Sequence, residues 1–254
     1  MIVDVERHRY LSSEHPRDFI PFAHRGGTGH APENTVAAFR HAFDLGFRHL
    51  ETDVHVTSDG VLVAFHDDDL ARICGRPGRI GELPWREVAD ARVDGDHRIP
   101  LLSDLLEEFP AARFNIDAKS DAAVEPLLAV LHRHGAIDRA CIGSFSHRRL
   151  VAVRRRARVC TSASPLEVAR WLSGLVPSAP DCFQVPVTRG RIPVVTPRSV
   201  ARAHRADKPV HVWTIDDPRE MQRLIDIGVD GIMTDDPATL KRVAHENGYW
   251  SAAS

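Results

Sequence analysis

Residues 19–56 decide the fold, and they read FIPFAHRGGTGHAPENTVAAFRHAFDLGFRHLETDVHV. An apolar run at 19–24 is followed by a helical pattern at 32–46 and then by a second apolar run at 49–56. The helical pattern begins after a Pro signal and ends in Gly, as helix caps predict. The stretch is therefore predicted to form one strand–helix–strand unit.

The same alternation continues along the chain. Six further strand candidates follow, at 113–119, 140–145, 159–164, 182–187, 209–215 and 230–235. Helical patterns such as DPREMQRLIDIG at 217–228 lie between them. Eight strands alternating with helices in about 250 residues are typical of an α/β fold of the (β/α)8 TIM barrel type. A doubly wound parallel sheet is the alternative. Because no linker or low-complexity segment divides the chain, we expect one domain over residues 1–254.

The segment at about 57–100 is rich in Gly, Pro and charged residues and does not continue the alternation of strands and helices. It is predicted to be a small insertion after the second strand, on one barrel mouth, beginning with a hairpin turned at Asp59-Gly60. A two-residue turn would pair Ser58 with Val61 and Val54 with Phe65. Asp53 would then lie opposite His66, and directly opposed residues share a face of the sheet.

Composition narrows the functional classes. With a formal net charge of −2, the chain shows no sign of a nucleic-acid or membrane surface. No apolar run reaches the roughly 18 residues of a transmembrane helix. The N-terminal residues 1–19 lack the apolar core of a signal peptide, which favours the cytoplasm. The cysteines are widely spaced and are expected to be free thiols: Cys74, Cys141, Cys160 and Cys182.

Titratable side chains gather where the predicted strands end. His24 and Arg25 end the first strand, and functional groups of such barrels collect at the C-terminal strand ends. Alternation places Glu51 beside Asp53 on the second strand, and Asp117 beside Lys119 on the third. Three carboxylates around one mouth suit a cation with oxygen ligands, such as Mg²⁺ or Ca²⁺. The alternative is structural, with Arg25 and Lys119 forming salt bridges to these carboxylates.

The chain resembles the glycerophosphodiester phosphodiesterase family. The resemblance rests on HRG at 24–26, PENT at 32–35, E-x-D at 51–53, the T-x-D-G turn at 57–60 and HD at 66–67. FNIDAK and the closing VHVWTIDDPREMQRLIDIGVDGIMTDDP are also similar, so the likeness covers about residues 20–240. It implies a TIM barrel that hydrolyses glycerophosphodiesters to glycerol 3-phosphate and an alcohol.

The resemblance also implies residue roles. Glu51, Asp53 and Asp117 would ligate one divalent metal, Mg²⁺ or Ca²⁺, and His24 and His66 would be the acid–base pair. Arg25 and Lys119 would hold the phosphate, and Trp213 would pack against the glycerol part of the substrate. The third-strand acid is usually Glu in the family. Asp117 is one methylene shorter, so a bridging water can replace its direct metal contact.

Two-histidine chemistry follows from what a phosphodiester requires. One histidine removes a proton from the attacking hydroxyl and the other protonates the departing alcohol. We assign His24 as base and His66 as acid. The attacking group is either the glycerol 2-hydroxyl, through a cyclic phosphate, or water. The partner is thus a small-molecule diester, without nucleic acid or stable membrane insertion. Two alternatives are a lysophospholipase D-like hydrolase, which an apolar groove beside the mouth would favour, and a non-catalytic barrel that binds phosphorylated ligands.

Overall fold

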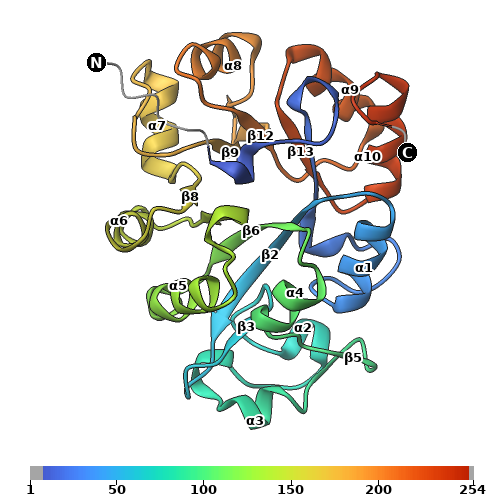
Figure 1. Ribbon diagram of the computed structural model, residues 1–254, viewed down its shortest axis with the longest axis vertical. Helices are drawn as coiled ribbons and strands as arrows, with labels where there is room; N and C mark the ends of the chain where they lie inside the picture. Colours follow the sequence, from blue (N-terminus) through green and yellow to red (C-terminus); the bar gives the residue numbers. More distant parts are fainter. Residues whose placement is uncertain (1–7, 252–254) are drawn as a thin grey trace.

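Eight parallel strands form the barrel of the structure, a computed structural model that describes residues 8–251 (Figure 1). Their order around the ring is β8-β7-β6-β2-β1-β13-β12-β9. A parallel bridge between Ser162 and Cys182 joins the two end strands. The predicted α/β (β/α)8 barrel is confirmed. The strands are β1 (Ile20–Ala23), β2 (His49–Val56), β6 (Arg113–Ala118), β7 (Ala140–Gly143), β8 (Cys160–Thr161), β9 (Phe183–Val185), β12 (Val210–Val212) and β13 (Gly231–Thr234).

Helices cover the outside of the ring. Thr35 caps the first of them by accepting a hydrogen bond from the Ala38 amide, and Gly228, in the left-handed conformation, ends α9. The predicted patterns at 32–46 and 217–228 are therefore confirmed as helices, each slightly shorter than its pattern. The surrounding helices are α1 (Val36–Asp44), α4 (Leu102–Glu108), α5 (Val124–Arg133), α6 (His147–Arg156), α7 (Pro165–Ser173), α8 (Pro197–His204), α9 (Pro218–Ile227) and α10 (Pro237–Glu246).

The predicted insertion lies between β2 and α4 and has its own small apolar core. Val63, Phe65, Ile80 and Val93 are all buried within it. This core packs the insertion together, and pairing of its first strand with the C-terminal part of β2 joins it to the barrel. Its elements are β3 (Leu62–Ala64), α2 (Ala71–Cys74), α3 (Trp85–Val88), β4 (Arg92–Val93) and β5 (His97–Arg98).

The register predicted for the first hairpin is wrong by one residue. Val54 pairs with Ala64 and Val56 with Leu62, so the predicted Val54–Phe65 pair does not form. The Thr57 amide donates to the Val61 carbonyl, which leaves a loop of Ser58, Asp59 and Gly60 instead of a two-residue turn. Two contacts stabilise the longer loop: the Thr57 hydroxyl donates to Asp59, and the Val61 amide donates to the Thr57 hydroxyl oxygen. Gly60, at φ 87°, supplies the left-handed residue that three-residue loops need.

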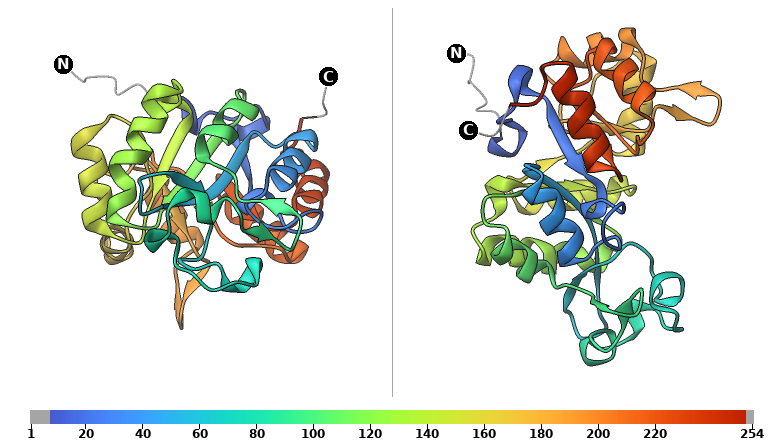
Figure 2. Two further views of the ribbon diagram at one scale, coloured as in Figure 1. Left: turned by 90° about the horizontal axis from the view of Figure 1, so that it is seen from below. Right: turned by 90° about the vertical axis from the view of Figure 1, so that its right-hand side faces the viewer.

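A second hairpin was not predicted. The strands β10 (Thr188–Arg189) and β11 (Ile192–Pro193) follow β9 and pair with each other alone. In Figure 2 (left) this hairpin projects from the same side of the barrel as the insertion. Its sequence, TRGRIP, is too short and too charged to give a strand pattern. The two hairpins together border the mouth at the C-terminal ends of the strands.

The segment before β1 contacts the C-terminal end of the described chain at the opposite face of the barrel. Residues 8–18 precede β1 and run beneath the N-terminal ends of the strands, with short 3-10 turns at Arg9–Leu11 and Pro16–Asp18. The ring of His15 packs on that of Trp250, with 4.3 Å between centroids, and His15 also contacts Ser251. Residues 1–7, part of the segment 1–19 on which the prediction about a signal peptide rests, lie outside the described residues. Within the described part of the chain, no helix is long and apolar enough to span a bilayer.

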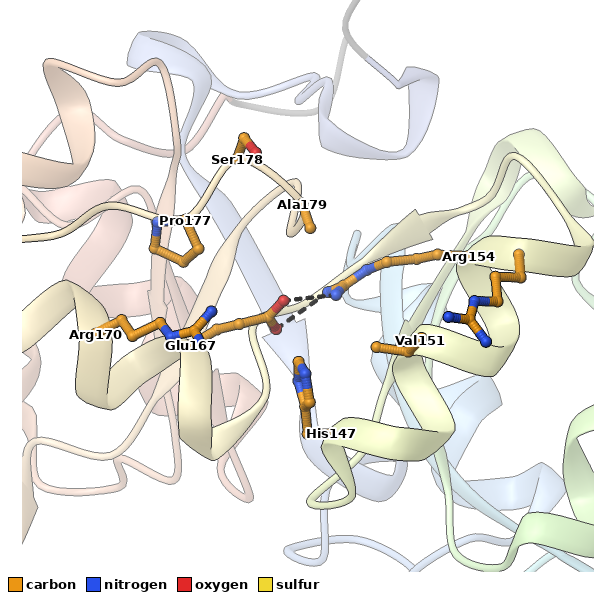
Figure 3. Close-up of a pocket in the computed structure, with 9 residues that line it drawn as sticks. His147, Val151, Arg154, Glu167, Arg170, Pro177, Ser178 and Ala179 are labelled. Carbon is orange, nitrogen blue, oxygen red and sulfur yellow. Dashed lines mark hydrogen bonds and ion pairs between the residues drawn. The ribbon is translucent and has the colours of Figure 1, made fainter.

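One ion pair joins the neighbouring helices α6 and α7. Figure 3 shows Arg154 facing Glu167 across the gap between them, and the shorter of their contacts is 2.6 Å. The Glu167 side chain is 3% exposed and also accepts a hydrogen bond from the Ser164 amide, which caps α7. The pair therefore fixes the packing of two adjacent helices while it closes a helix end.

Candidate active site

The turn after β1 is built by residues that tolerate an unusual backbone. Arg25 has φ 51°, and Gly26 and Gly27 both have φ 85°. A Cβ on Gly26 would lie 2.8 Å from the Phe39 amide nitrogen, and one on Gly27 would lie 2.6 Å from the ring of Pro237. Glycine is therefore required at both positions. A non-glycine residue held in the left-handed region is typical of functional sites, and here it is Arg25.

His24 lies between two carboxylates. Its Nδ1 is 2.8 Å from Asp235 Oδ1, and its Nε2 is 3.8 Å from Glu51 Oε2. Burial lowers the pKa of His24, but the charge of Glu51 and the hydrogen bond that the ring donates to Asp235 outweigh burial, so the net pKa is raised. The Asp235 carboxylate fixes the proton on Nδ1, and Nε2 then faces the mouth as the atom that exchanges protons.

Glu51 and Asp53 point from β2 into the barrel mouth and are both buried. Glu51 Oε2 accepts a hydrogen bond of 2.9 Å from the Arg25 amide. Burial and the neighbouring charge of Asp53 raise the pKa of Glu51 to about 7. Burial acts the same way on Asp53, but Lys119 and Arg25 outweigh it and lower the Asp53 pKa. The two carboxylates therefore differ in proton affinity although they stand on one strand.

Asp117 and Lys119 end β6 beside this pair. The strand register places Asp117 directly next to Asp53. Lys119 Nζ lies 2.7 Å from Asp53 Oδ1 and 2.8 Å from Asp117 Oδ2, so one ammonium bridges the two acids. Burial lowers the pKa of Lys119, but Asp117 and Asp53 outweigh it and raise the net pKa. The salt bridges considered as a structural alternative for Arg25 and Lys119 do form, with Arg25 Nε 3.3 Å from Asp53.

His66 reaches the same mouth by a route that the sequence did not predict. Phe65, not His66, lies opposite Asp53, and the Phe65 amide donates to the Asp53 carbonyl. The strand β3 ends at Ala64, and the chain then turns so that the ring of His66 lines the mouth. Its Nδ1 is 2.6 Å from Asp67 Oδ1, an arrangement like that of His24 with Asp235. Each imidazole is thus oriented by its own aspartate.

One cavity of about 540 Å³ collects all the side chains singled out from the sequence. It opens at the C-terminal ends of the strands, where such barrels carry their active sites. On its polar wall, both histidines lie together with the charged side chains at the ends of β1, β2 and β6. Its lining includes His24, Arg25, Glu51, Asp53, His66, Asp117, Lys119 and Trp213.

Several residues of the site had no signal that sequence reasoning could use. The Asn34 side-chain amide donates to Asp53 at 3.4 Å, and its side-chain carbonyl oxygen accepts from Thr52. Glu33 accepts hydrogen bonds from Arg25 and Arg72. The PENT motif therefore positions the catalytic groups as well as starting α1. Asp235, more than two hundred residues after His24, could be linked to it only by the closure of the barrel.

The acidic residues offer a donor set that fits a hard divalent cation. Asp117 Oδ1 is buried and has no hydrogen-bond partner among residues 8–251, which leaves a carboxylate oxygen free to ligate. Glu51 and Asp53 supply two more carboxylates, and oxygen ligands suit Mg²⁺ or Ca²⁺. No three imidazole or carboxylate ligand atoms in the described ranges lie within 4.8 Å of one another. Lys119 contacts both Asp53 and Asp117, so a cation bound by these carboxylates would displace its ammonium.

The arrangement is suited to acid–base chemistry on an anion. Two oriented imidazoles can give and take protons, while Arg25 and Lys119 supply positive charge beside them. The opposite wall is apolar and includes Trp213, Phe145 and Ile192. A substrate with an anionic centre and a less polar substituent would match both walls.

Comparison with known proteins identifies the pattern. Residues 24–239 match the model of the glycerophosphoryl diester phosphodiesterase family. A Mycobacterium tuberculosis protein named probable glycerophosphodiester phosphodiesterase 2 is 41% identical over 251 residues, which cover 92% of this chain and 94% of that protein. A human lysophospholipase D is 25% identical and covers 94% of this chain and 88% of its own.

A solved structure agrees with the fold. An Oleispira antarctica phosphodiesterase, in complex with the product sn-glycerol-3-phosphate, superposes with a TM-score of 0.77. The match covers 89% of this chain and 96% of that one at 22% identity. At this identity the likeness concerns the fold of the chain.

Proposed function

This chain belongs to the glycerophosphoryl diester phosphodiesterase family, and on that premise we propose that His24 and His66 perform its hydrolysis by acid–base catalysis with a divalent metal. It is an enzyme that hydrolyses glycerophosphodiesters. One observation carries the finer proposal: both aspartate-oriented histidines line the cavity that also holds Glu51, Asp53 and Asp117. The products would be glycerol 3-phosphate and an alcohol.

Arg25 and Lys119 would bind the phosphate. Both are cations that point into the cavity, and both now hold Asp53. A phosphodiester repels incoming nucleophiles through its negative charge, and neutralising that charge lowers the barrier. An incoming anion competes with Asp53 and Asp117 for the Lys119 ammonium. Lys119 would then transfer from the carboxylates to a phosphate oxygen.

His24 would act as the general base and His66 as the general acid. Asp235 holds Nδ1 of His24, so Nε2 is left to take the proton of the attacking hydroxyl. Asp67 holds His66 in the same manner, and Nε2 of His66 would give a proton to the departing alcohol. The attacking group is the glycerol 2-hydroxyl, through a cyclic phosphate that water opens, or water itself. Trp213 would pack against the glycerol.

The family generally works with a divalent metal, and here Glu51, Asp53 and Asp117 would hold it. When bound, such a cation neutralises the phosphate and stabilises negative charge on its oxygens. The high proton affinity of Glu51, with its pKa at about 7, reflects two buried acids close together. A cation between them would offset this repulsion. Mg²⁺ and Ca²⁺ both fit the oxygen donors.

Hydrolysis of lysophospholipids is a second candidate. The cavity has a large apolar wall, in which Phe145 is 69% and Ile192 60% exposed. These residues come from the loop after β7 and from the β10–β11 hairpin, not from the insertion. Exposed apolar side chains beside a phosphodiester site would suit a substrate with one acyl chain. One relative is itself a lysophospholipase D.

A substrate panel with controlled metal tests both the chemistry and the cofactor. Metal-stripped enzyme is incubated with glycerophosphocholine, glycerophosphoethanolamine, glycerophosphoglycerol, glycerophosphoinositol or a lysophosphatidylcholine. Each incubation receives Mg²⁺, Ca²⁺, Mn²⁺ or excess chelator. Glycerol 3-phosphate is detected with a coupled dehydrogenase and lysophosphatidate by mass spectrometry. We expect turnover only with metal, at least about 100-fold above the chelated sample, because the carboxylates alone leave the phosphate charge unbalanced. If turnover is unchanged in excess chelator, the proposal that hydrolysis requires a divalent metal is wrong.

Three further statements about the chain stay predictions. They are that residues 1–254 form one domain with an insertion at about 57–100, that the protein is cytoplasmic, and that it acts on a small molecule without nucleic acid or membrane insertion.

A further inference from the structure

Three of the four cysteines lie together inside the barrel. Cys141 is on β7, Cys160 is on the adjacent β8, and Cys182 comes just before β9. Their sulfur atoms all lie within 4.8 Å of one another, and all three residues are fully buried. The fourth, Cys74, is half-buried in the insertion. Residues 41 positions apart in the chain thus bring three thiols to one point.

A histidine without a partner stands beside these thiols. His211 on β12, the strand next to β9, is 0% exposed. Neither of its ring nitrogens has a hydrogen-bond partner within the described part of the chain. A buried imidazole normally satisfies at least one nitrogen, and an orphaned one requires an explanation. The ring nitrogens of His211 do not lie within 4.8 Å of all three sulfur atoms, so binding one ion with all four residues would involve a rotation of the imidazole.

We propose that Cys141, Cys160, Cys182 and His211 form a site for one Zn²⁺ ion in the core of the barrel. Three sulfurs and one imidazole nitrogen are the ligand set of a closed, structural zinc site. The metal would give His211 the partner that it lacks. The thiols would release their protons to water as Zn²⁺ binds, leaving thiolates at the ion.

This site differs chemically from the one at the mouth. Thiolates and imidazole are soft or borderline ligands that select Zn²⁺, whereas the carboxylates of the mouth suit hard cations. The surroundings of the thiols are apolar and include Ile20, Phe22 and Met233. The neighbouring Asp181 carboxylate accepts a hydrogen bond from the Thr161 amide, so the ligands of the ion would be thiolates and an imidazole, which disfavour Mg²⁺ and Ca²⁺. The inference therefore does not depend on the metal proposed for catalysis.

The position of the site suggests what the ion does. The β8 and β9 ends of the ring are joined by one bridged residue pair, Ser162 with Cys182. An ion held by Cys160 and Cys182 would cross-link these ends, and Cys141 and His211 would extend the link to the next strand on each side. The ion would then close the ring at the place where the hydrogen-bonded ladder is shortest.

The cluster also lies one layer beneath the floor of the catalytic cavity. Each cysteine comes two residues before a residue that lines the cavity, and residues two apart in an extended chain share a face. The floor residues above Cys141, Cys160 and Cys182 are Gly143, Ser162 and Gln184. Tyr10 lies beneath the barrel, fully buried, and its hydroxyl donates to Asn115. Because Tyr10 closes this route, the ion would enter while the chain folds.

Metal analysis and cobalt substitution test the site in the full chain. The protein is purified from zinc-supplemented cells, dialysed against chelator to empty the mouth, and analysed for zinc. A second sample is unfolded, stripped and refolded with Co²⁺. We expect about one zinc per chain after dialysis and, with Co²⁺, the near-ultraviolet thiolate-to-cobalt charge-transfer band that oxygen ligands cannot produce. A wild-type protein without zinc and without that band would overturn the proposal.

Matched variants locate the ligands. Cys141→Ser and Cys182→Ser should lose the charge-transfer band and most of the zinc, while Cys74→Ser should keep both. His211→Phe should retain the band with an altered visible spectrum, because three thiolates remain. If a cluster variant fails to fold, the wild-type zinc content and cobalt spectrum still decide the question. A Cys182→Ser protein that folds and shows the same band as Cys74→Ser would also contradict the site.

Discussion

The two histidines proposed as the acid–base pair have different surroundings. His24 lies between Glu51 and Asp235, and both acids favour its charged form. His66 contacts Asp67, whose other hydrogen bonds come from Arg72. The pKa of Asp67 is lowered to about 2, first of all by Arg72. His24 therefore faces an aspartate on the barrel itself, whereas His66 depends on a network within the insertion.

The leaving group distinguishes base from acid. His66→Ala should slow hydrolysis of glycerophosphocholine by about 10²–10⁴-fold, because the departing alcohol lacks a proton donor. With a p-nitrophenyl leaving group, which needs no proton, the same variant should be within about 10-fold of wild type. His24→Ala should be slow with both substrates, since a base is needed in either case. The measurement is kcat/KM for each enzyme and substrate.

The control is His132→Ala, an exposed histidine on α5 that should leave both rates unchanged. If His24→Ala, rather than His66→Ala, recovers with the nitrophenyl substrate, the two roles are exchanged. If both variants keep full activity on both substrates, acid–base catalysis by this pair is wrong.

Among the elements, the location of each strand in the sequence could be predicted better than its register and its neighbours in space. The eight strands could be found because each is a short apolar run bounded by turn residues. The first hairpin could be found from Asp59-Gly60, but its register depended on the side chain of Thr57, which lengthens the loop by one residue. Local propensity does not report such contacts. The pairing of His24 with Asp235 and the gathering of three cysteines depend on ring closure, which no local pattern contains.

The α6–α7 ion pair gives a prediction about stability. Glu167→Gln keeps the shape of the side chain and can still cap Ser164, but it leaves Arg154 without its charge partner. Breaking a buried pair in this way should lower the free energy of unfolding by about 3 kcal/mol. Urea denaturation at pH 7 measures it. As a control, Glu246→Gln removes an exposed pair with Arg242 and should change stability by less than about 0.5 kcal/mol. If Glu167→Gln and Glu246→Gln lower the free energy of unfolding equally, the buried pair stabilises the fold no more than the exposed pair does.

For the whole molecule, the base of the barrel depends on an uncharged histidine. His49, at the start of β2, contacts the Tyr10 carbonyl through Nε2 at 2.8 Å. Its ring centroid lies 5.2 Å from those of Tyr10 and Phe22. Burial lowers its pKa from 6.5 to about 3. The His49 imidazole therefore connects the N-terminal segment to the base of the barrel, and it is neutral in the folded chain.

The contribution of His49 to the stability of the fold should accordingly fall in mild acid, whereas Glu51, with its pKa raised to about 7, contributes with the opposite sign between pH 4.5 and 7. Between pH 6.5 and about 3 the unfolded chain binds a proton at His49 that the folded chain does not, so acid favours unfolding. The contribution of His49 to the free energy of unfolding is complete above pH 6.5 and is lost as the pH falls toward 3. Its slope is up to about 1.4 kcal/mol per pH unit. Urea unfolding from pH 4.5 to 7 should show this slope reduced in His49→Gln. His132→Gln should retain it, and identical slopes in all three proteins would contradict the assignment.

The meeting of the two chain ends at His15 and Trp250 has a practical consequence. Because both ends of the described chain lie beneath the barrel, an enzyme immobilised through either terminus would present its cavity to the bulk phase.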